Sequence, residues 1–435
     1  MKPMRPFQIG LLSSFAILGV LSVVLLAGFD IVRNQQENPY GDGVIIWGTL
    51  DEQAFYQVFI DVTQDNKNFK VVEYYEKDPR TFEEELVNAI AEGRSPDAIL
   101  LPSEDLVTYR SKIQPIPYET LPQRTFKDQY LDGFEIFMLP EGTYALPFAV
   151  DPLILYWNRD ILAAAGLAEA PRSWESLVNL VAPAVTVRNS SREIIMSTIA
   201  FGEFRNVLYA TEVISMLIMQ SGSRMVEATE RGYEVALDDP VVEGARKPME
   251  AALQFFLDFS NANSALYSWN RSQPDDLTAF LAEDLALYFA KGSDYQRIRE
   301  LNPNFNFDVA PVPQGATATT KRSYGTFYGF AILKASQNKN GAYQAISTIT
   351  SPAVSATITE RVNLAPANRS LIAAGSSDPF RQLIMQQALV ARSWLIPDKN
   401  DTDGIFQLMV EDVSSNRLKV GNAVSDAVRR LELAY

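Results

Sequence analysis

Several acidic and aromatic side chains stand beside short apolar runs, at places where strands are expected to end. A carboxylate accepts hydrogen bonds from hydroxyl groups, and an aromatic ring packs on the apolar face of a ligand. This combination is typical of sugar recognition, because a pyranose offers an apolar CH face and a ring of hydroxyl donors. The candidate ligand-binding residues are Trp47, Asp51, Glu104, Asp151, Tyr324 and Trp394.

The most unusual candidate is Asp151, which lies with Pro152 between two apolar runs in LPFAVDPLILYWNRD, residues 146–160. A strand that is apolar on both sides usually lies in the middle of a sheet, where a proline lacks the N–H that the ladder needs. We therefore expect one sheet to end here and another to begin. Asp151 would then lie at the floor of a cleft, and Pro152 would stiffen a hinge.

Ordinary structural roles are the alternative for other candidates. Trp47 could belong to a hydrophobic core, and Asp51 or Glu104 could cap the start of a helix. The acidic run 83–85 lies in an amphipathic helical pattern, which favours a solvated helix face over a paired-carboxylate site.

The chain has no cysteine and no histidine among its 435 residues. This excludes thiol nucleophiles, Ser-His-Asp triads and the common zinc sites, and leaves only mechanisms based on carboxylate, lysine or tyrosine. The segment 399–411 resembles a calcium loop, but Lys399 and Val410 stand where oxygen ligands are required. We expect no cofactor and no metal. The net charge of −15, without a basic cluster, argues against a nucleic-acid partner.

The N-terminal run 7–29 carries no charge and follows Lys2 and Arg5. At about 1.5 Å per residue a helix of this length crosses a bilayer. A cleaved signal peptide is the alternative, although its apolar region would normally be shorter. The charge bias predicts a single-pass anchor with a cytoplasmic N-terminus and an extracellular remainder. Residues 34–43 are polar and contain Pro and Gly, so they read as a tether.

Further along the chain, short strand-like runs alternate with helical stretches of about a dozen residues from residue 44 onwards, which predicts an α/β lobe with a mostly parallel sheet. From residue 153 long helical patterns dominate, among them the run 276–292. Strand character returns at 307–313 and 329–336, which indicates that the chain crosses back to the first lobe. A length of 435 residues also favours two domains.

Four segments in this order resemble the family 1 extracellular solute-binding proteins, the maltose-binding type that serves ABC importers. YALPFAVDPLILYWNRDILAAAGLAEAPRSWESLVNL resembles the family's Pro-aromatic strand, its Asn-Arg-Asp helix entry and its Trp-Glu helix start. AFLAEDLALYFAKGSDYQRI stands at the family's Gly-Lys segment, FNFDVAPVPQG resembles its Pro-x-Pro strand end, and GFAILKASQNKNGAYQAISTITSPAVSATITERVNLAPANRSLI resembles its closing strand and helices. The resemblance covers about residues 44–435.

The resemblance implies a two-lobe periplasmic-binding-protein-like fold of type II, which here would follow the N-terminal transmembrane helix predicted from the run 7–29. The expected parts are residues 1–33 as cytoplasmic start and anchor, 34–43 as tether, 44–150 plus about 309–367 as the first lobe, and 151–308 plus about 368–435 as the second. Ser293 and Asp294 stand where sugar-binding members often carry Pro-Trp. Loss of that stacking residue argues against a maltodextrin-like ligand.

The function implied by the family is capture of a small polar solute, a carbohydrate in our expectation, between two closing lobes. The partners would be this solute and the permease subunits of an ABC importer, the receptor would be a monomer, and it would not be an enzyme. Two alternatives stay open. One is a ligand-sensing ectodomain for a membrane partner, and the other is a carboxylate-based enzyme that acts on glycosides.

Overall fold

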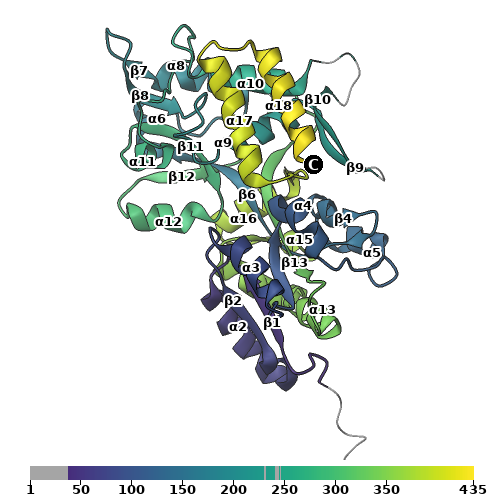
Figure 1. Ribbon diagram of the computed structural model, residues 1–435. Helices are drawn as coiled ribbons and strands as arrows, with labels where there is room; N and C mark the ends of the chain where they lie inside the picture. The colour runs from purple at the N-terminus through teal and green to yellow at the C-terminus, as the bar shows by residue number, and fades with distance from the viewer. Residues whose placement is uncertain (1–37, 230–231, 241–243, 245) are drawn as a thin grey trace, which may run out of the picture.

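The fold is organised around one large mixed sheet in a computed structural model that describes residues 38–229, 232–240, 244 and 246–435. Neighbouring strands follow the order β2-β1-β3-β13-β6-β11-β8-β7. Two long strands, β6 (Leu146–Asn158) and β13 (Ser323–Ile332), lie in the middle and pair with each other antiparallel. Figure 1 shows them running between a lower lobe, which contains β1 and β2, and an upper lobe, which contains β8 and β11.

The first lobe contains the predicted alternation of strands and helices. Strand β1 pairs in parallel with both β2 and β3, and β13 closes the sheet antiparallel to β3. The main elements are β1 (Val44–Gly48), α2 (Glu52–Asp65), β2 (Val72–Glu76), α3 (Phe82–Ala91), β3 (Ala98–Pro102), α13 (Lys339–Ile349) and α14 (Pro352–Arg361). Helix α2 buries Ala54, Phe55, Val58 and Phe59, which recur on one face, so that face covers the sheet.

Short elements connect the first lobe to the rest of the chain. Those before β6 are the 3-10 turns Lys67–Val71, Ser103–Asp105, Arg110–Lys112 and Asp132–Phe137, the helices α4 (Leu106–Tyr109) and α5 (Gln123–Gln129), and the strands β4 (Met138–Leu139) and β5 (Gly142–Thr143). Those after α14 are β14 (Ala365–Pro366), α15 (Arg369–Ala374), α16 (Pro379–Val390) and β15 (Ala391–Arg392).

The second lobe is also α/β. Strand β11 (Leu285–Lys291) runs parallel to β8 (Ile194–Ile199) and antiparallel to β6. The other strands are β7 (Val187–Arg188), the hairpin β9 (Ser223–Thr229) and β10 (Gly232–Pro240), and β12 (Phe307–Ala310). The helices are α6 (Arg159–Ala164), α7 (Trp174–Ser176), α8 (Ala182–Val185), α9 (Ala210–Gln220), α10 (Pro248–Asp258), α11 (Asp276–Leu281), α12 (Asp294–Leu301), α17 (Lys399–Ser414) and α18 (Val420–Ala434), with a π turn at Leu177–Val181.

The predicted helix over 276–292 is wrong in its second half. Helix α11 ends at Leu281, Glu283 turns the chain with a φ of 62°, and β11 follows. All residues of β11 except Lys291 are buried, so both faces of the strand are covered. A strand buried on both faces has no alternating pattern, and its apolar run resembles that of a buried helix.

The predicted change of sheet at Asp151 and Pro152 is present in the strand pairing, although β6 itself continues through both residues within one mixed sheet. The partners on both sides of β6 change at this point, since β13 pairs as far as Pro152 and β12 only from Leu155 onwards. Strand β14 pairs with Ala149 and Val150, whereas β11 pairs from Leu153 onwards. The missing N–H of Pro152 therefore falls where these neighbours change, at the passage of β6 from one lobe into the other.

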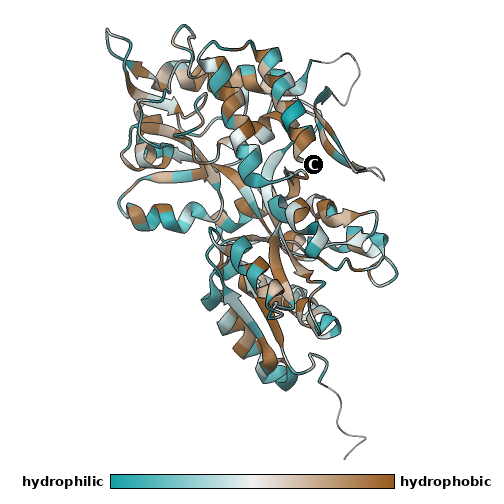
Figure 2. Cartoon of the chain, viewed as in Figure 1, coloured by the Kyte–Doolittle hydropathy of each residue, from teal (hydrophilic) through white to brown (hydrophobic). Residues whose placement is uncertain are grey.

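Two hydrophobic cores lie on the sheet. One takes most of its residues from 40–150 and 327–367, and the other is made mainly of residues from 153–289 and 394–431. Aromatic residues of the second lobe, such as Phe280 and Phe305, continue the first core past the crossing strands. Figure 2 shows the same division, with apolar residues along the central strands and polar ones along the outward surfaces of the helices.

Two helix ends show the local residues that physical chemistry favours there. Ser173 caps α7, since its side chain accepts a hydrogen bond from the N–H of Ser176. Gly166 follows α6 with a φ of 75°, the left-handed conformation that ends many helices. The predicted membrane span 7–29 lies outside the described residues, and within them no helix is both long and apolar enough to cross a bilayer.

Candidate functional site

The ends of parallel strands from both lobes meet beside the middle of β6. In α/β sheets, ligands bind at the carboxyl ends of strands. Strand β3 of the first lobe ends at Pro102 and leads into Glu104, while β11 of the second lobe ends at Lys291. The Lys291 Nζ and the Glu104 Oε1 lie 3.9 Å apart, so these strand ends face one another across the boundary between the lobes.

Glu104 is the centre of a buried hydrogen-bond network. Its Oε1 accepts from the Tyr324 hydroxyl at 3.0 Å and from the Thr326 hydroxyl at 2.5 Å, and its Oε2 accepts from Ser103 Oγ at 3.0 Å. Glu104 is 4% exposed and Tyr324 is 1% exposed. Burial, followed by the charge of Glu104, raises the pKa of Tyr324 well above its usual value, which keeps the phenol a donor. Two predicted site residues are thus in direct contact.

Asp151 lies on β6 opposite Thr326 and binds the loop after β11. Its Oδ2 accepts from Ser293 Oγ at 2.6 Å, and its Oδ1 accepts from the Ser293 N–H at 3.1 Å. The residue is 2% exposed. Burial raises the pKa of Asp151 to about 6, while the nearby Lys291 charge and the Ser293 hydrogen bonds act in the opposite direction.

Lys291 lies between the Glu104 network and Asp151 and interacts with both. Its Nζ donates to Thr326 Oγ1 at 2.7 Å and lies 5.8 Å from the ring centroid of Tyr209. Burial alone would lower the pKa of Lys291, but surrounding carboxylates, of which Glu104 contributes most, hold it above its usual value. The residues Glu104, Asp151, Lys291, Ser293, Tyr324 and Thr326 form what we call the interlobe polar cluster.

The polar surroundings extend into the second lobe. The Tyr209 hydroxyl donates to Asp294 Oδ2 at 2.6 Å. Lys399, at the start of α17, binds Asp403 at 2.9 Å and lies 3.8 Å from Glu212 on α9. The cluster and these surroundings together therefore combine two lysines with a larger number of carboxylates and with hydroxyl groups, an array that offers both donors and acceptors to a polar ligand.

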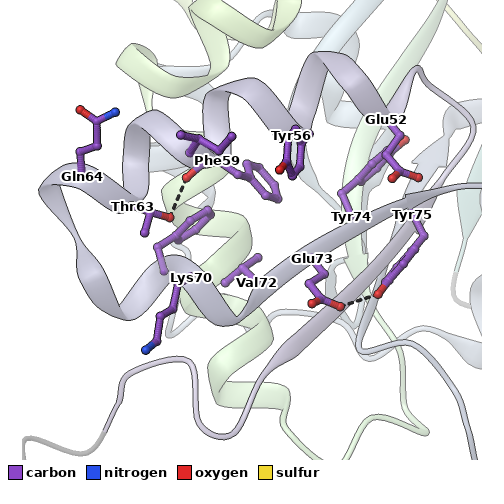
Figure 3. A pocket seen from close by; sticks show the side chains of 12 residues that line it. Glu52, Tyr56, Phe59, Thr63, Gln64, Lys70, Val72, Glu73, Tyr74 and Tyr75 are labelled. Carbon is purple, nitrogen blue, oxygen red and sulfur yellow. Dashed lines mark hydrogen bonds between the residues drawn. The ribbon is translucent and has the colours of Figure 1, made fainter.

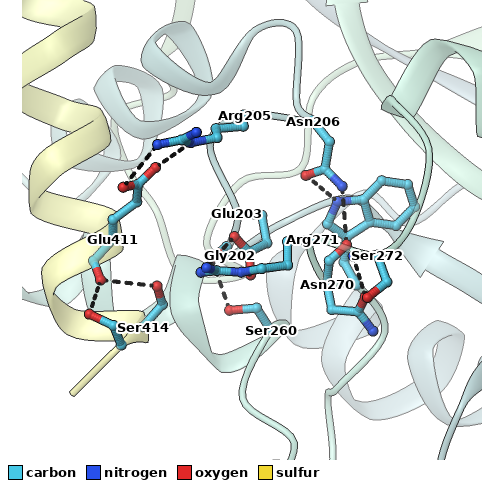
Figure 4. A network of polar contacts seen from close by, with 12 residues as sticks. Gly202, Glu203, Arg205, Asn206, Ser260, Asn270, Arg271, Ser272, Glu411 and Ser414 are labelled. Atoms are coloured by element: carbon cyan, nitrogen blue, oxygen red, sulfur yellow. Dashed lines mark hydrogen bonds and ion pairs between the residues drawn. The ribbon is translucent and has the colours of Figure 1, made fainter.

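A second polar network follows the carboxyl end of β8 (Figure 4). Arg205 donates to Glu411 at 2.7 Å, and Arg271 approaches Glu203 to 3.4 Å. The Trp269 indole donates to the side-chain oxygen of Asn206 at 3.2 Å. The network fixes the loop 200–209, which lies on the ligand-binding side of an α/β sheet by the same rule of strand ends.

Trp47 and Asp51 lie at the carboxyl end of β1. The Lys77 Nζ sits 4.1 Å from the centroid of the Trp47 ring, and the tryptophan is only partly buried. Asp51 caps α2, because its Oδ1 accepts from the Gln53 N–H at 3.0 Å. The structural alternative for Asp51 is thus present, and neither residue contacts the interlobe polar cluster through a hydrogen bond or ion pair within the described chain.

Trp394 has the surroundings of a core residue. It is 2% exposed, its indole donates to Ser215 Oγ at 3.1 Å, and its ring stacks near Phe406. The structure thus brings Glu104, Asp151 and Tyr324 together at one place and leaves Trp47, Asp51 and Trp394 apart from it. The ligand-binding role of all six residues stays a prediction.

Sequence reasoning missed three members of the cluster, namely Lys291, Ser293 and Thr326. Lys291 and Ser293 lie in a segment that was singled out only for its departure from the family pattern. A signal was present, because a charged residue that ends an apolar run is unusual. It was hidden by the helical interpretation of 276–292. Thr326 gave no local signal, since its role comes from its position opposite Asp151.

One cavity of about 600 Å³ lies away from the interlobe boundary, between α2 and the edge strand β2 (Figure 3). Tyr56, Ile60 and Tyr75 line it and are 57%, 43% and 40% exposed. None of the six predicted ligand-binding residues borders it.

Comparisons with known proteins identify related sequences. A family model described as bacterial extracellular solute-binding protein matches residues 58–382. A protein of Brucella abortus (strain 2308), whose name describes it only as a binding protein, is 22% identical over 298 residues. A protein of Brucella suis biovar 1 gives the same values. The match spans 66% of this chain and 66% of the relative, slightly under two thirds of the relative's length.

Solved structures share the architecture. A cyclo/maltodextrin-binding protein in complex with maltotetraose has a TM-score of 0.70 at 15% identity, covering 90% of this chain and 96% of its own. A solute-binding protein of an ABC transporter from Thermotoga lettingae, bound with α-D-tagatose, has a TM-score of 0.67 at 18% identity, covering 91% and 100%. The GacH receptor of Streptomyces glaucescens has a TM-score of 0.67 at 18% identity, and the match covers 90% of this chain and 98% of the receptor. At these identities the likeness shows the two-lobe fold.

Proposed function

The chain belongs to the bacterial extracellular solute-binding proteins, and we propose that it captures a small polar solute between its two lobes. This family consists of binding proteins and not of enzymes, and it acts outside the cytoplasm. The observation that carries the proposal is the interlobe polar cluster, in which strand ends of both lobes are joined by Lys291, Thr326 and Glu104. A solute that replaces some of these contacts would bind both lobes at once.

We propose a carbohydrate as the solute. The cluster and its surroundings supply carboxylate acceptors, lysine donors and hydroxyl groups, which match the hydroxyl ring of a sugar. The described structural neighbours are complexes with maltotetraose and tagatose, and the GacH receptor was solved with acarbose. Ser293 and Asp294 stand where the family resemblance places a Pro-Trp pair, so Asp294 replaces the stacking tryptophan, which favours a small sugar over a long maltodextrin.

The six predicted residues have distinct proposed roles. Asp151 and Glu104 accept hydrogen bonds from the solute, while Tyr324 orients Glu104. Trp47 and Asp51, at the carboxyl end of β1, form the wall of the first lobe. Trp394 lies in the core of the second lobe and supports the wall of that lobe from behind. At most, the edge of its ring contacts the solute.

We propose that closure of the lobes delivers the solute to an ABC importer. The lobes would be residues 44–150 plus about 309–367, and 151–308 plus about 368–435, and they would bend about the crossings in β6 and β13. A ligand stabilises the closed state only by the free energy of its additional contacts there. The importer is then expected to recognise the closed monomer.

We also propose that residues 7–29 anchor the protein in the cell membrane, with a cytoplasmic N-terminus and residues 34–43 as an extracellular tether. A run of 23 uncharged residues after Lys2 and Arg5 supports this arrangement. The lobes would then capture solute at the outer face of the membrane, beside the importer.

A thermal-shift screen tests the proposed function. The full-length chain in mild detergent is heated with mono- and oligosaccharides, polyols and glycerol phosphates. We expect at least one carbohydrate to raise the midpoint of unfolding in proportion to the logarithm of its concentration, without being consumed. If only a glycerol phosphate stabilises the protein, the solute belongs to that class and is not a carbohydrate. Turnover of a glycoside that Asp151→Asn abolishes would contradict a pure binding function.

A further inference from the structure

A cavity of about 540 Å³ lies between the lobes and shares no residue with the interlobe polar cluster. The first lobe contributes Glu135 and Met138 to its lining, and the second lobe contributes residues 223–228 of the β9 hairpin. Arg322 and Arg392 line it from the crossing segments, where β13 and β15 pair in parallel at Tyr324 and Arg392.

Positive charge gathers at one side of this cavity. Arg392 donates to Asp132 Oδ2 at 3.2 Å, and Arg369 donates to Asp132 Oδ1. Arg322 forms no ion pair within the described chain, and its guanidinium donates only to the backbone oxygen of Lys321. Arg369 and Arg392 therefore share a single aspartate, and Arg322 adds a third positive charge that acts on it.

The carboxylates that line the cavity have cationic partners of their own. Glu135 binds Lys127 at 2.8 Å. Glu227 lies 3.9 Å from Arg224, which also approaches Asp239. Within the described residues around this cavity, the positive charge of Arg322 thus has no carboxylate of its own, in a chain whose net charge is −15.

The arginines also affect one another. Burial lowers the pKa of Arg392, and repulsion from Arg322 lowers it further. The hydrogen bond from Arg369 lowers the pKa of Asp132, and the charges of Arg392 and Arg322 add to this effect. Two partly buried guanidinium groups that repel each other are stabilised when an anion lies between them.

We propose that this cavity is a second ligand site, which binds a small oxyanion, either a phosphate or a carboxylate, between Arg322 and Arg392. The planar guanidinium group matches both anions with paired N–H donors. A cavity of about 540 Å³ accommodates an anion of the size of phosphate or malonate. Since both lobes form its walls, a bound anion favours the lobe arrangement that presents both arginines to it.

Calorimetric titration tests the site. The full-length chain is titrated with inorganic phosphate and, separately, with malonate, at constant ionic strength and in chloride buffer. We expect both or one of them to bind, and the stronger of the two identifies the anion class. Arg322→Gln is expected to weaken binding about tenfold or more, because it removes a charge-assisted contact.

Two further variants separate loss of the site from loss of charge or fold. Arg361→Gln removes an exposed arginine of α14 and is expected to bind the anion like the wild type. Arg392→Lys keeps the charge, loses the planar donor fork and should bind with reduced affinity. The proposal is overturned if the wild type gives no binding heat with either anion. It is equally overturned if a folded Arg322→Gln, with wild-type circular dichroism, binds phosphate as tightly as wild type does.

Discussion

Asp151 is a carboxylate in a strand whose thirteen residues are all buried, and its neighbours explain why it is tolerated. A buried carboxylate is costly unless donors or an opposite charge compensate it. Ser293 donates twice, and Lys291 supplies the nearest positive charge. These donors come from the end of β11 in the second lobe, beside the point where β6 passes from one lobe into the other.

Asp151→Asn is expected to weaken solute binding about tenfold or more and to leave stability close to that of the wild type. The amide oxygen can still accept from Ser293 N–H, but the charged acceptor is lost. Calorimetry with the solute from the screen, together with thermal unfolding, measures both effects. Asp61→Asn, on the exposed face of α2, is the control. An equal loss of binding and stability would make Asp151 a structural residue.

Solute binding is also expected to depend on pH through Asp151. Its folded-state pKa of about 6 lies above that of an exposed aspartate, so its contribution to folding is present at low pH and lost as pH rises from about 4 to 6. The pH dependence of solute binding has the opposite sign, because a solute hydroxyl donates a hydrogen bond to the ionised form of Asp151. Affinity should fall about tenfold from pH 7 to pH 5.

Calorimetry from pH 5 to pH 8 measures this dependence, and Asp151→Asn should flatten it. Lys291, Glu104 and Asp294 face the same region, and burial raises the pKa of Asp294 as well. An unchanged pH profile in Asp151→Asn would assign the titration to Asp294 and contradict the role of Asp151.

At the residue scale, the sequence was most informative where a side chain conflicts with its local pattern. Asp151 was identified because an acid interrupts an apolar run. Lys291 and Thr326 were not identified from the sequence, because their importance depends on which strands become neighbours. Asp51 and Trp394 have the residue types of a sugar site, yet Asp51 caps α2 and Trp394 packs in a core.

At the element scale, the alternation of strands and helices predicted the α/β character of the first lobe, and the strands that cross between the lobes were harder to predict. A proline and an acid predicted a change of sheet, and the neighbours of β6 do change there, but the strand itself continues. In 276–292, β11 has no alternating pattern because both of its faces are buried. Strands shared by two lobes depend on long-range pairing, which local propensity does not encode.

The cap at α7 offers a test at this scale. Ser173→Ala is expected to lower the free energy of unfolding by about 1 kcal/mol, because the N–H of Ser176 loses its acceptor. Ser173→Thr keeps a side-chain oxygen and should therefore retain most of the stabilisation that the cap provides. Urea unfolding measures both variants. If alanine and threonine destabilise the protein equally, the side chain of Ser173 contributes through packing and not as a cap.

At the scale of the whole molecule, the lobes are held by more than the crossing strands. Arg110 of the first lobe donates to the Tyr233 hydroxyl of the β10 hairpin strand at 2.9 Å, and Tyr435 packs on the Tyr233 ring. Thr108 also bonds to the backbone oxygen of Pro397. The number of lobes and their order along the chain followed from sequence patterns. The contacts between lobes did not, since they join residues that are far apart in the chain.

The proposed anchor is tested by extraction of native membranes. We expect the protein to stay in the pellet after carbonate and high-salt washes and to enter solution only in detergent, because removing an apolar span from lipid is unfavourable. N-terminal sequencing of the extracted protein should start before residue 7. Release by carbonate together with a start near residue 30 would show a cleaved signal peptide instead.

The most direct test of capture between the lobes is a distance measurement across them. The chain has no native cysteine, so spin labels attach only at Gln53→Cys and Leu208→Cys, two exposed positions that follow the carboxyl ends of β1 and β8. Double electron–electron resonance then compares the full-length protein with and without the solute found in the screen. We predict that saturating solute shortens the distance between the labels and that Asp151→Asn requires more solute for the same change. An unchanged distance in a sample that the solute stabilises against heat would contradict closure of the lobes around it.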